Sequence, residues 1–159
     1  IKAAGSPASD SPIAELRARV LLFPVPGISF QRLIDTFAEP RSGNRVHHAL
    51  DIPAPRGTPV LSVQSGRVLK RPTTKAGGLM VYVSDPTERY IYVYAHLDHY
   101  RSGLAVGDEI AQGDTIGFVG TTGNAPPNTP HLHFAIARSK NIKRWSKGKA
   151  VNPYAVFKP

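Results

Sequence analysis

The chain has 159 residues, of which 41% are apolar and 19% charged, and its formal net charge is +9. This length suits a single domain with a hydrophobic core, and the composition excludes an intrinsically disordered chain. The absence of cysteine excludes disulfide bonds and thiolate ligands, so any metal ion must be held by His, Asp or Glu. No stretch is apolar enough to cross a membrane as a helix.

The N-terminal residues are small, polar and proline-bearing, and they predict a flexible leader or linker over residues 1–19. A short helical segment is expected around residues 13–20. The folded domain is predicted to occupy residues 20–159. Because the chain starts with Ile1 and not with methionine, we expect a processed or trimmed product whose export signal has been removed.

Residues 21–25, with the sequence LLFPV, predict a first strand that Pro26 and Gly27 end. Residues 29–37 predict either a short helix or an irregular segment. From residue 46 onward, short runs of β-branched and aromatic residues alternate with Gly, Pro, Asn and Asp. These runs predict strands within residues 48–52, 58–70, 79–85, 89–97, 109–120 and 132–137.

The spacing of these runs is typical of an antiparallel all-β domain. One hairpin is predicted over residues 83–94, where Asp85 and Pro86 open the turn. The predicted fold class is therefore all-β and mainly antiparallel, with a short N-terminal helical or irregular segment.

Five of the six histidines fall in three strand-associated motifs. In NTPHLHFAI, His131 and His133 take alternate positions, so in a strand both side chains point to one face. In RVHHALD, His47 and Asp51 are four residues apart, and YAHL places His96 after an aromatic strand. Imidazole and carboxylate together suit a divalent first-row metal ion, zinc above all.

A catalytic zinc site needs three protein ligands and an open position for water. The motifs supply His47, Asp51 and one histidine of HLH, and further histidines are left to move protons or to stabilise charge. Each pattern alone also fits ordinary structural hydrogen bonding. Only their combination favours a metal site.

Five separated segments occur in an informative order: RVHHALDIPAPRGTPVLSVQSGRV, YAHL, GDEIAQGDTIGFVGTTG, PHLHFAI and the closing VNPYAVF. Together they resemble the lysostaphin-like (LytM-type) zinc endopeptidases of bacterial cell walls. The resemblance covers about residues 37–157. It implies a duplicated-hairpin β-sandwich with an open groove, and a zinc metallopeptidase domain over residues 20–159.

The resemblance also implies a role for each motif residue. One zinc ion would be held by three ligands: His47, Asp51 and His133. His96 and His131 would be catalytic histidines beside the metal, and which of them is the main base stays open. The implied reaction is zinc-dependent hydrolysis of a peptide bond in the stem or cross-link peptides of peptidoglycan, during cell-wall remodelling or lysis.

Two further residues are candidates for contacts with the oxyanion or the substrate. Arg41 precedes the first ligand and carries a fixed positive charge, and Tyr94 shares the period-two face of His96. The loops at residues 74–78 and 123–129 are expected to form the groove walls, because both join strands near the site.

Ala49 departs from the family pattern, which has glycine two residues before the aspartate. If that position needs a positive φ, the methyl group crowds the turn. His48 and His99 are expected to be structural, and His48 should point away from His47 in an extended segment.

Two other interpretations remain. A catalytically silent relative, which binds peptidoglycan or activates an amidase, would lack some of the ligands or histidines, and all five positions are present here. A lipoyl- or biotinyl-type carrier has similar Gly-punctuated strands to VGDEIAQGDTIGFVG. No lysine lies on an evident modification hairpin, however, and a carrier leaves the histidines unexplained.

The positive charge predicts attraction to anionic envelope polymers in addition to the peptidoglycan substrate. The densest basic cluster surrounds the only tryptophan, Trp145, and its simplest interpretation is a solvated face or loop. No nucleic-acid-binding motif is present, so nucleic acid is not an expected partner. The expected protein is a monomer of the cell envelope, periplasmic or extracellular.

Overall fold

The structure is a computed structural model that describes residues 11–41 and 43–159. Its helical elements are α1 (Pro12–Ala18), α2 (Pro153–Phe157) and two 3-10 turns, η1 (Phe30–Arg32) and η2 (Ile142–Arg144). The strands are β1 (Leu50–Pro53), β2 (Pro59–Leu61), β3 (Gly66–Lys70), β4 (Thr73–Thr74), β5 (Gly78–Ser84), β6 (Tyr90–Tyr100), β7 (Glu109–Ile110), β8 (Thr115–Val119), β9 (His131–Arg138) and β10 (Lys149–Val151).

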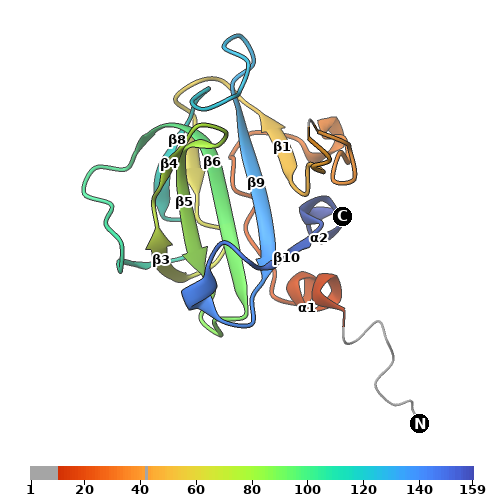
Figure 1. Cartoon of the computed structure of the whole chain (residues 1–159), viewed down its shortest axis with the longest axis vertical. Helices are drawn as coiled ribbons and strands as arrows, with labels where there is room; N and C mark the ends of the chain where they lie inside the picture. Colours follow the sequence, from red (N-terminus) through yellow and green to blue (C-terminus); the bar gives the residue numbers. More distant parts are fainter. Residues whose placement is uncertain (1–10, 42) are drawn as a thin grey trace.

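The strand pairings are antiparallel, and the main path through the sheet runs β1-β9-β6-β5-β3-β7. Strand β10 also pairs with β9, β4 with β5, and β8 with both β6 and β2. Figure 1 shows β9, β6 and β5 next to one another at the centre of this arrangement. The prediction of an all-β, mainly antiparallel fold is confirmed.

The long strand β6 changes partners along its length. Residues 90–95 pair with β9, and the strand from Leu97 onward pairs with β8. Strand β8 in turn pairs with β2, so β2 and β8 continue the sheet from this part of β6. Just after β2, the Val63 N–H donates to the hydroxyl of Tyr94 on β6. The core is thus enclosed between the central strands and the segment around β2 and β8.

Strand β9 separates the core from the opposite face of the sheet. Leu132, Phe134 and Ile136 are at most 1% exposed and belong to the core. The intervening residues, among them His131 and His133, are only partly buried and line a groove. This burial pattern confirms the predicted alternation, with both histidines on one face. The alternation arises because one side of the strand must pack into the core.

Strand β6 contains a β-bulge at the groove. Between two paired positions, Met80 of β5 stands opposite both Ala95 and His96 of β6. His96 takes a left-handed backbone conformation with φ of +62°, which residues other than glycine seldom adopt. Its N–H donates to the Gly77 carbonyl at 2.8 Å. The bulge turns two consecutive side chains of β6 toward the same groove.

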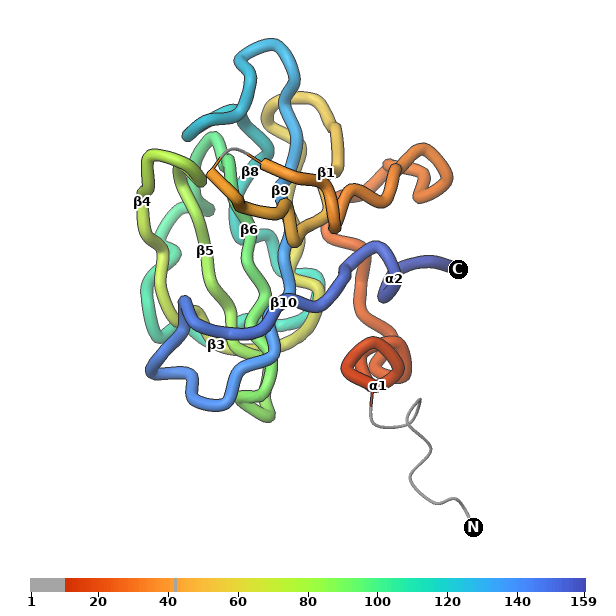
Figure 2. The backbone as a smooth tube through the Cα atoms, turned by 45° about the vertical axis from the view of Figure 1, so that its right-hand side comes forward, coloured from red at the N-terminus to blue at the C-terminus, as the bar shows by residue number. Residues whose placement is uncertain are grey.

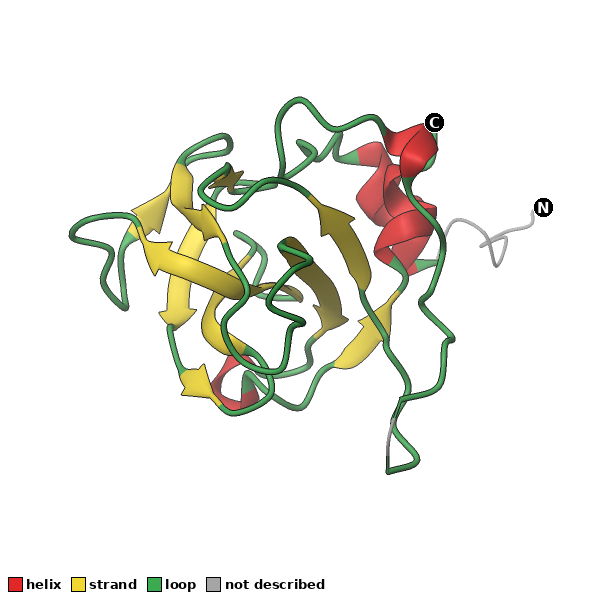
Figure 3. Cartoon of the chain, turned by 90° about the horizontal axis from the view of Figure 1, so that it is seen from above, coloured by secondary structure: helices red, strands yellow, loops and turns green. Residues whose placement is uncertain are grey.

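Residues 12–18, which fall in the predicted leader, form helix α1. The Ser11 side chain accepts from two backbone N–H groups of the first turn and so caps the helix. Leu16 is fully buried, and the Arg17 guanidinium donates to backbone carbonyls of α2 and of the residue after it. Figure 3 shows the two helices next to each other at one edge of the strands. The folded domain therefore begins before residue 20, because this helix buries an apolar side chain and bonds to α2.

The predicted first strand at residues 21–25 is not a regular strand. Leu22 N–H donates to the Val63 carbonyl, and the Pro24 carbonyl accepts from Leu61. Prolines at 24 and 26 remove two N–H donors, so this extended segment cannot continue a ladder. The predicted leader at residues 1–10 lies outside the described residues. Within the described residues, no helix is long and apolar enough to cross a membrane.

The predicted hairpin forms between β5 and β6, and a buried carboxylate holds its turn. Asp85 Oδ1 accepts from the Tyr90 N–H at 2.8 Å and from the Arg89 N–H at 3.0 Å. Its Oδ2 lies 2.7 Å from the Arg19 guanidinium, just beyond α1. Burial raises the pKa of Asp85, but hydrogen bonds from Thr87, Tyr90 and Arg19 outweigh burial and lower it below its ordinary value.

Asp85→Asn is expected to lower the free energy of unfolding at pH 7 by about 2–4 kcal/mol, since a buried ion pair loses one partner. The folded-state pKa is lower than the unfolded one, so this contribution is present above about pH 4 and fades as the pH falls further. Urea unfolding at pH 7 and pH 3 checks this. The exposed turn variant Glu88→Gln is the control. An equal loss at both pH values would contradict the charge-based explanation.

Candidate active site

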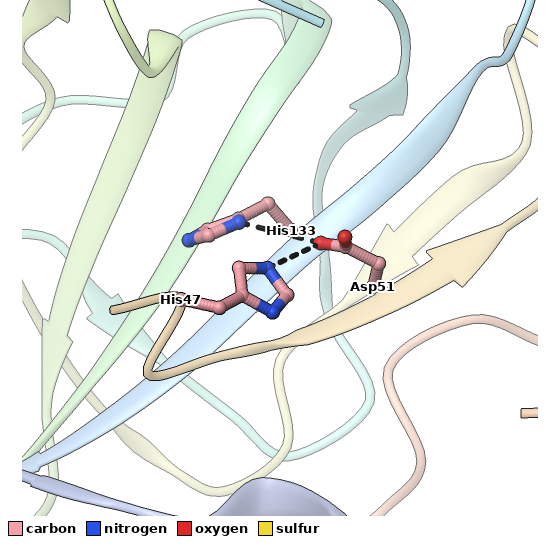
Figure 4. Close-up of side chains that lie close together, drawn as sticks. All are labelled: His47, Asp51 and His133. Atoms are coloured by element: carbon pink, nitrogen blue, oxygen red, sulfur yellow. Dashed lines mark hydrogen bonds and ion pairs between the residues drawn. The ribbon is translucent and has the colours of Figure 1, made fainter. Parts of the chain in front are cut away.

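Five side chains from separate parts of the chain meet on the sheet face opposite the core. They are His47, just before β1; Asp51, on β1; His96, at the bulge of β6; and His131 and His133, on β9. All five line one groove of about 1130 Å³. Figure 4 shows three of them, with the carboxylate of Asp51 next to both imidazole rings.

The strand register brings these side chains together. Asp51 on β1 stands directly opposite His133 on β9, and His133 stands opposite Ala95 on β6. Oδ1 of Asp51 lies 3.0 Å from Nε2 of His47 and 3.3 Å from Nδ1 of His133. The ligand atoms of these three residues all lie within 4.8 Å of one another.

The spacing of these atoms fits a zinc ion. Tetrahedral zinc bonds of about 2.0–2.2 Å place neighbouring ligand atoms roughly 3.4 Å apart. Both contacts of the Asp51 carboxylate are close to this value, so little rearrangement is needed for the ion to enter. Two imidazoles and one carboxylate form a mixed N/O donor set that zinc accepts, and the groove leaves a fourth direction open.

The protonation of His47 is set by its other ring nitrogen. Nδ1 lies 3.1 Å from the carbonyl oxygen of Thr36 and 2.9 Å from the hydroxyl of the same residue. A carbonyl only accepts, so Nδ1 carries a proton, and Nε2 is the nitrogen that faces the Asp51 carboxylate. Thr36 therefore orients the His47 ring so that Nε2 is the nitrogen that could hold a metal ion.

The two remaining histidines are oriented in the same way. Nδ1 of His96 lies 2.8 Å from the Thr122 carbonyl, and Nδ1 of His131 lies 3.0 Å from the Thr129 carbonyl. Each Nδ1 must therefore donate, and each Nε2 is the basic nitrogen. The two rings meet edge to face with centroids 5.0 Å apart, and the His96 ring lies 5.6 Å from that of His133.

The surroundings of Asp51 and His96 shift the pKa values of both groups. Burial raises the pKa of Asp51, but hydrogen bonds from His133 and His47, and their charge, hold it well below its ordinary value. Burial lowers the pKa of His96 to about 4, and the neighbouring His133 and His131 act in the same direction. His96 is therefore neutral at physiological pH and able to accept a proton.

Arg41 lies on the rim of the groove beside the metal-ligand candidates. Its Nη2 atom is 3.8 Å from Oδ2 of Asp51, and its Nη1 atom donates to the carboxylate of Glu39. The guanidinium thus lies beside the carboxylate that contacts both candidate ligand histidines.

The structure places Tyr94 in the core and not in the groove, so the expected substrate contact is wrong on geometry. Its side chain is fully buried, and its hydroxyl accepts from Val63. The period-two relation to His96 fails because the bulge adds one residue to β6 between them. Tyr94 and His96 therefore point to opposite faces of the sheet.

The positive φ near the first ligand belongs to His48, with φ of +53°, and not to Ala49. Ala49 is almost completely buried, so its methyl group is accommodated at the position where the family pattern has glycine. The expectation of an extended His48 is wrong; its ring instead packs against Phe37, with centroids 5.2 Å apart. His99 stacks on Phe118 at the surface, away from the site.

Both loops expected to wall the groove do so. Residues from the stretch 74–77 line one side, and residues from 124–130 line another. Three functional contacts were not predicted from the sequence: the carbonyl groups of Thr36, Thr122 and Thr129 that orient the histidines. Of these, only Thr129 lies near its histidine in sequence, and a backbone carbonyl leaves no residue-type signal.

Comparisons with known proteins agree with this geometry. The model of Peptidase family M23 matches residues 45–153. The L-Ala–D-Glu endopeptidase of Bacillus subtilis is 32% identical over 131 residues, which are 78% of this chain and 40% of that protein. The peptidoglycan DD-endopeptidase ShyC of Vibrio cholerae is 33% identical over 112 residues, covering 67% of this chain and 25% of the relative.

Among solved structures, a putative glycyl-glycine endopeptidase lytM from Ruminococcus gnavus superposes with a TM-score of 0.71 and 29% identity. The match covers 86% of this chain and 59% of that one. This chain spans less than half the length of the two curated relatives. The resemblance to LytM-type and lysostaphin-like enzymes is confirmed, and the chain belongs to peptidase family M23.

Proposed function

We propose that this chain is a zinc-dependent endopeptidase that hydrolyses peptide bonds of peptidoglycan. One observation carries the proposal: three ligand atoms lie within 4.8 Å of one another beside two oriented imidazoles in an open groove. The names of the relatives support this substrate, because the Bacillus protein is an L-Ala–D-Glu endopeptidase and the Vibrio protein a peptidoglycan DD-endopeptidase. The two names differ in the bond, so the bond cleaved here stays open.

The proposed ligands of the zinc ion are His47, Asp51 and His133. When bound, zinc supplies a Lewis acid for the scissile carbonyl and lowers the pKa of a water molecule to near 7. Asp51 supplies a negative charge that offsets part of the charge of the cation. Its contacts to Nε2 of His47 and Nδ1 of His133 already bring the three proposed donor atoms together.

His96 and His131 act on protons in this proposal. Water adds to the carbonyl carbon, the C–N bond breaks, and one proton must move from the water to the departing nitrogen. Each histidine offers a basic Nε2, because its Nδ1 donates to a fixed carbonyl. A neutral imidazole of this kind accepts the proton first and donates it later.

The alternative is a catalytically silent relative that binds peptidoglycan or activates an amidase. Such a protein needs no basic nitrogen beside the metal ligands. Here both histidines are held with Nδ1 on a carbonyl, an arrangement that binding alone does not require. The geometry therefore favours an enzyme.

Metal removal is expected to abolish peptide release. Purified peptidoglycan is digested with metal-replete protein, with chelated protein, and with chelated protein after stoichiometric zinc is returned, and the released muropeptides are identified by mass. Only the first and third reactions should release peptides, and the masses should identify the bond. Release at the full rate by metal-free protein would contradict the proposed function.

Arg41 is proposed to contact the substrate carbonyl or the developing oxyanion. Arg41→Ala is expected to lower kcat/KM by about 10–100-fold, because a fixed charge at the groove is lost, while zinc content stays at one per chain. Arg56→Ala, which removes an exposed guanidinium that pairs with Asp98, is the matched control. An unchanged kcat/KM in the Arg41 variant would show that Arg41 contacts neither the substrate carbonyl nor the oxyanion.

The proposed location is the cell envelope, periplasmic or extracellular, where peptidoglycan is the substrate. The chain is proposed to act as a monomer. Its net charge of +9 supports attraction to anionic envelope polymers, and that attraction should weaken as salt rises from low to physiological strength.

A further inference from the structure

The groove does not end at the proposed metal site. A second hollow of about 250 Å³ continues from it, and four residues line both parts: His47, His133, Met80 and Tyr82. Beyond His133, the floor is formed by small side chains of β9, Ala135 and Ala137. An extended chain that passes the ligands can therefore continue along β9 without meeting a bulky residue on that strand.

The strand register gives the distance of this extension from the ligands. Tyr82 on β5 stands opposite Val93 on β6, and Val93 stands opposite Ala135 on β9. This row lies two residues along β9 from His133. At about 3.3 Å per residue, the row is roughly 7 Å from the row of His133, which is the length of two residues of an extended peptide.

Trp145 stands over this row. Its ring meets Tyr82 edge to face, with centroids 4.7 Å apart and planes at 75°. The segment between β9 and β10, which carries Trp145, folds back across β5 and β6, as Figure 2 shows. Around the tryptophan the hollow is lined by the small residues Ser146, Gly148 and Ala150. The hollow thus has one aromatic wall, and many of its other lining residues have small side chains.

The same segment carries a concentration of positive charge. Residues 139–150 contain no Asp or Glu. They contain five basic residues, namely Lys140, Lys143, Arg144, Lys147 and Lys149. Across the described part of the chain, the ion pairs found involve none of these five. In the main groove, Arg41 and Arg45 are part of the lining, together with uncharged residues such as Pro53, Pro126 and Pro130.

We infer that the hollow at Trp145 is a substrate subsite for a carboxylate-bearing residue of the peptide, about two residues from the bond that is cleaved. The aliphatic part of that residue packs on the Trp145–Tyr82 wall, and its carboxylate faces the lysines of the 139–150 segment. The inference rests on the proposed function, since it takes the groove as the place of the substrate peptide. The hollow itself is lined by neither Lys nor Arg, but the 139–150 segment that forms its wall carries five basic residues and no acidic one. This charge selects the ligand, because it favours an anionic residue over a neutral one.

The test uses the only tryptophan of the chain as the reporter. Soluble muropeptides are titrated into chelated wild-type protein, once as isolated and once after their carboxylates have been converted to amides, and tryptophan emission is followed. The isolated peptides should give a saturable change in emission, with a Kd at least tenfold lower than that of the amidated peptides. Lys143→Gln/Lys147→Gln should reduce this preference to below about threefold. Lys70→Gln/Lys158→Gln, which removes two exposed charges elsewhere, should preserve it.

A second readout separates this inference from the proposed function. The same two peptide preparations are offered to zinc-loaded protein, and kcat/KM is measured for each. Cleavage of both at equal rates, with equal Kd values, would overturn the subsite and leave the endopeptidase intact. Preferential binding of isolated peptides without any cleavage would overturn the proposed activity and retain the subsite. A Trp145→Ala variant that keeps the full preference in kcat/KM would show that the tryptophan wall is not part of the subsite.

Discussion

His133→Ala is expected to abolish both stoichiometric zinc binding and peptidoglycan cleavage. The side chain of His133 contributes the Nδ1 atom that lies 3.3 Å from the Asp51 carboxylate, and it is the only proposed ligand on β9. With two ligands left, the affinity for zinc should fall by several orders of magnitude, because a structured zinc site depends on at least three protein donors. Zinc content after dialysis and muropeptide release together check this.

His99→Ala is the matched control, because His99 is an exposed histidine on the adjacent strand β6 that stacks on Phe118 outside the groove. That variant should keep one zinc ion per chain and full activity. The unfolding midpoint of His133→Ala should stay within a few degrees of that of the metal-free wild type, since its side chain is not part of the core. If the His133→Ala protein retained stoichiometric zinc, His133 would not be a ligand of the metal.

His96→Ala is expected to separate binding from turnover. The His96 ring is fixed by the Thr122 carbonyl and lies beside His131, and it is not among the three grouped ligands. Zinc content should therefore be unchanged, while kcat falls by about 10²–10⁴-fold, the usual contribution of a positioned acid–base group. Steady-state kinetics on muropeptides and metal analysis of the same preparation measure both quantities.

The positive φ of His96 calls for a second variant, because alanine is strained in this conformation. His96→Asn keeps a residue that tolerates the left-handed region, so its stability should be close to that of the wild type. Its kcat should nevertheless fall as far as that of His96→Ala. Recovery of activity in the asparagine variant would mean that the backbone at this position matters and the imidazole does not. The same pair of measurements on His131→Ala compares the two candidate bases.

The parts of the fold that follow from local pattern were predicted from the sequence. In β9, the alternation of His131, Leu132 and His133 is enforced by burial of one face, so period-two reasoning holds. The turn at Asp85 and Pro86 was also predictable, because its residues favour a turn through their own chemistry. The helical segment around residues 13–20 was predicted and is confirmed as α1, but it was assigned to a leader because the burial of Leu16 depends on contacts with distant segments.

The parts of the site that depend on irregular backbone were not predictable. The pattern of β6 reads as a regular strand, and on that basis Tyr94 and His96 share a face. The bulge breaks this relation, and it is set by pairing with β5 rather than by a residue type within β6. The orientation of the imidazoles likewise depends on backbone carbonyls, at Thr36 and Thr122, that are 11 and 26 residues away from their partners.

The bulge in β6 makes the site sensitive to chain length and not only to residue identity. If Ala95 were deleted, β6 and β5 would pair without an extra residue, and His96 would move into the row that Ala95 now occupies opposite His133. The ring would then shift by about one residue, roughly 3.3 Å along the strand, away from the carbonyl that fixes it. Such a chain would retain every proposed ligand and both candidate catalytic histidines, yet His96 would be misplaced. A single deletion here is therefore a more severe change than most substitutions of neighbouring residues, and a comparison of residue types alone would overlook it.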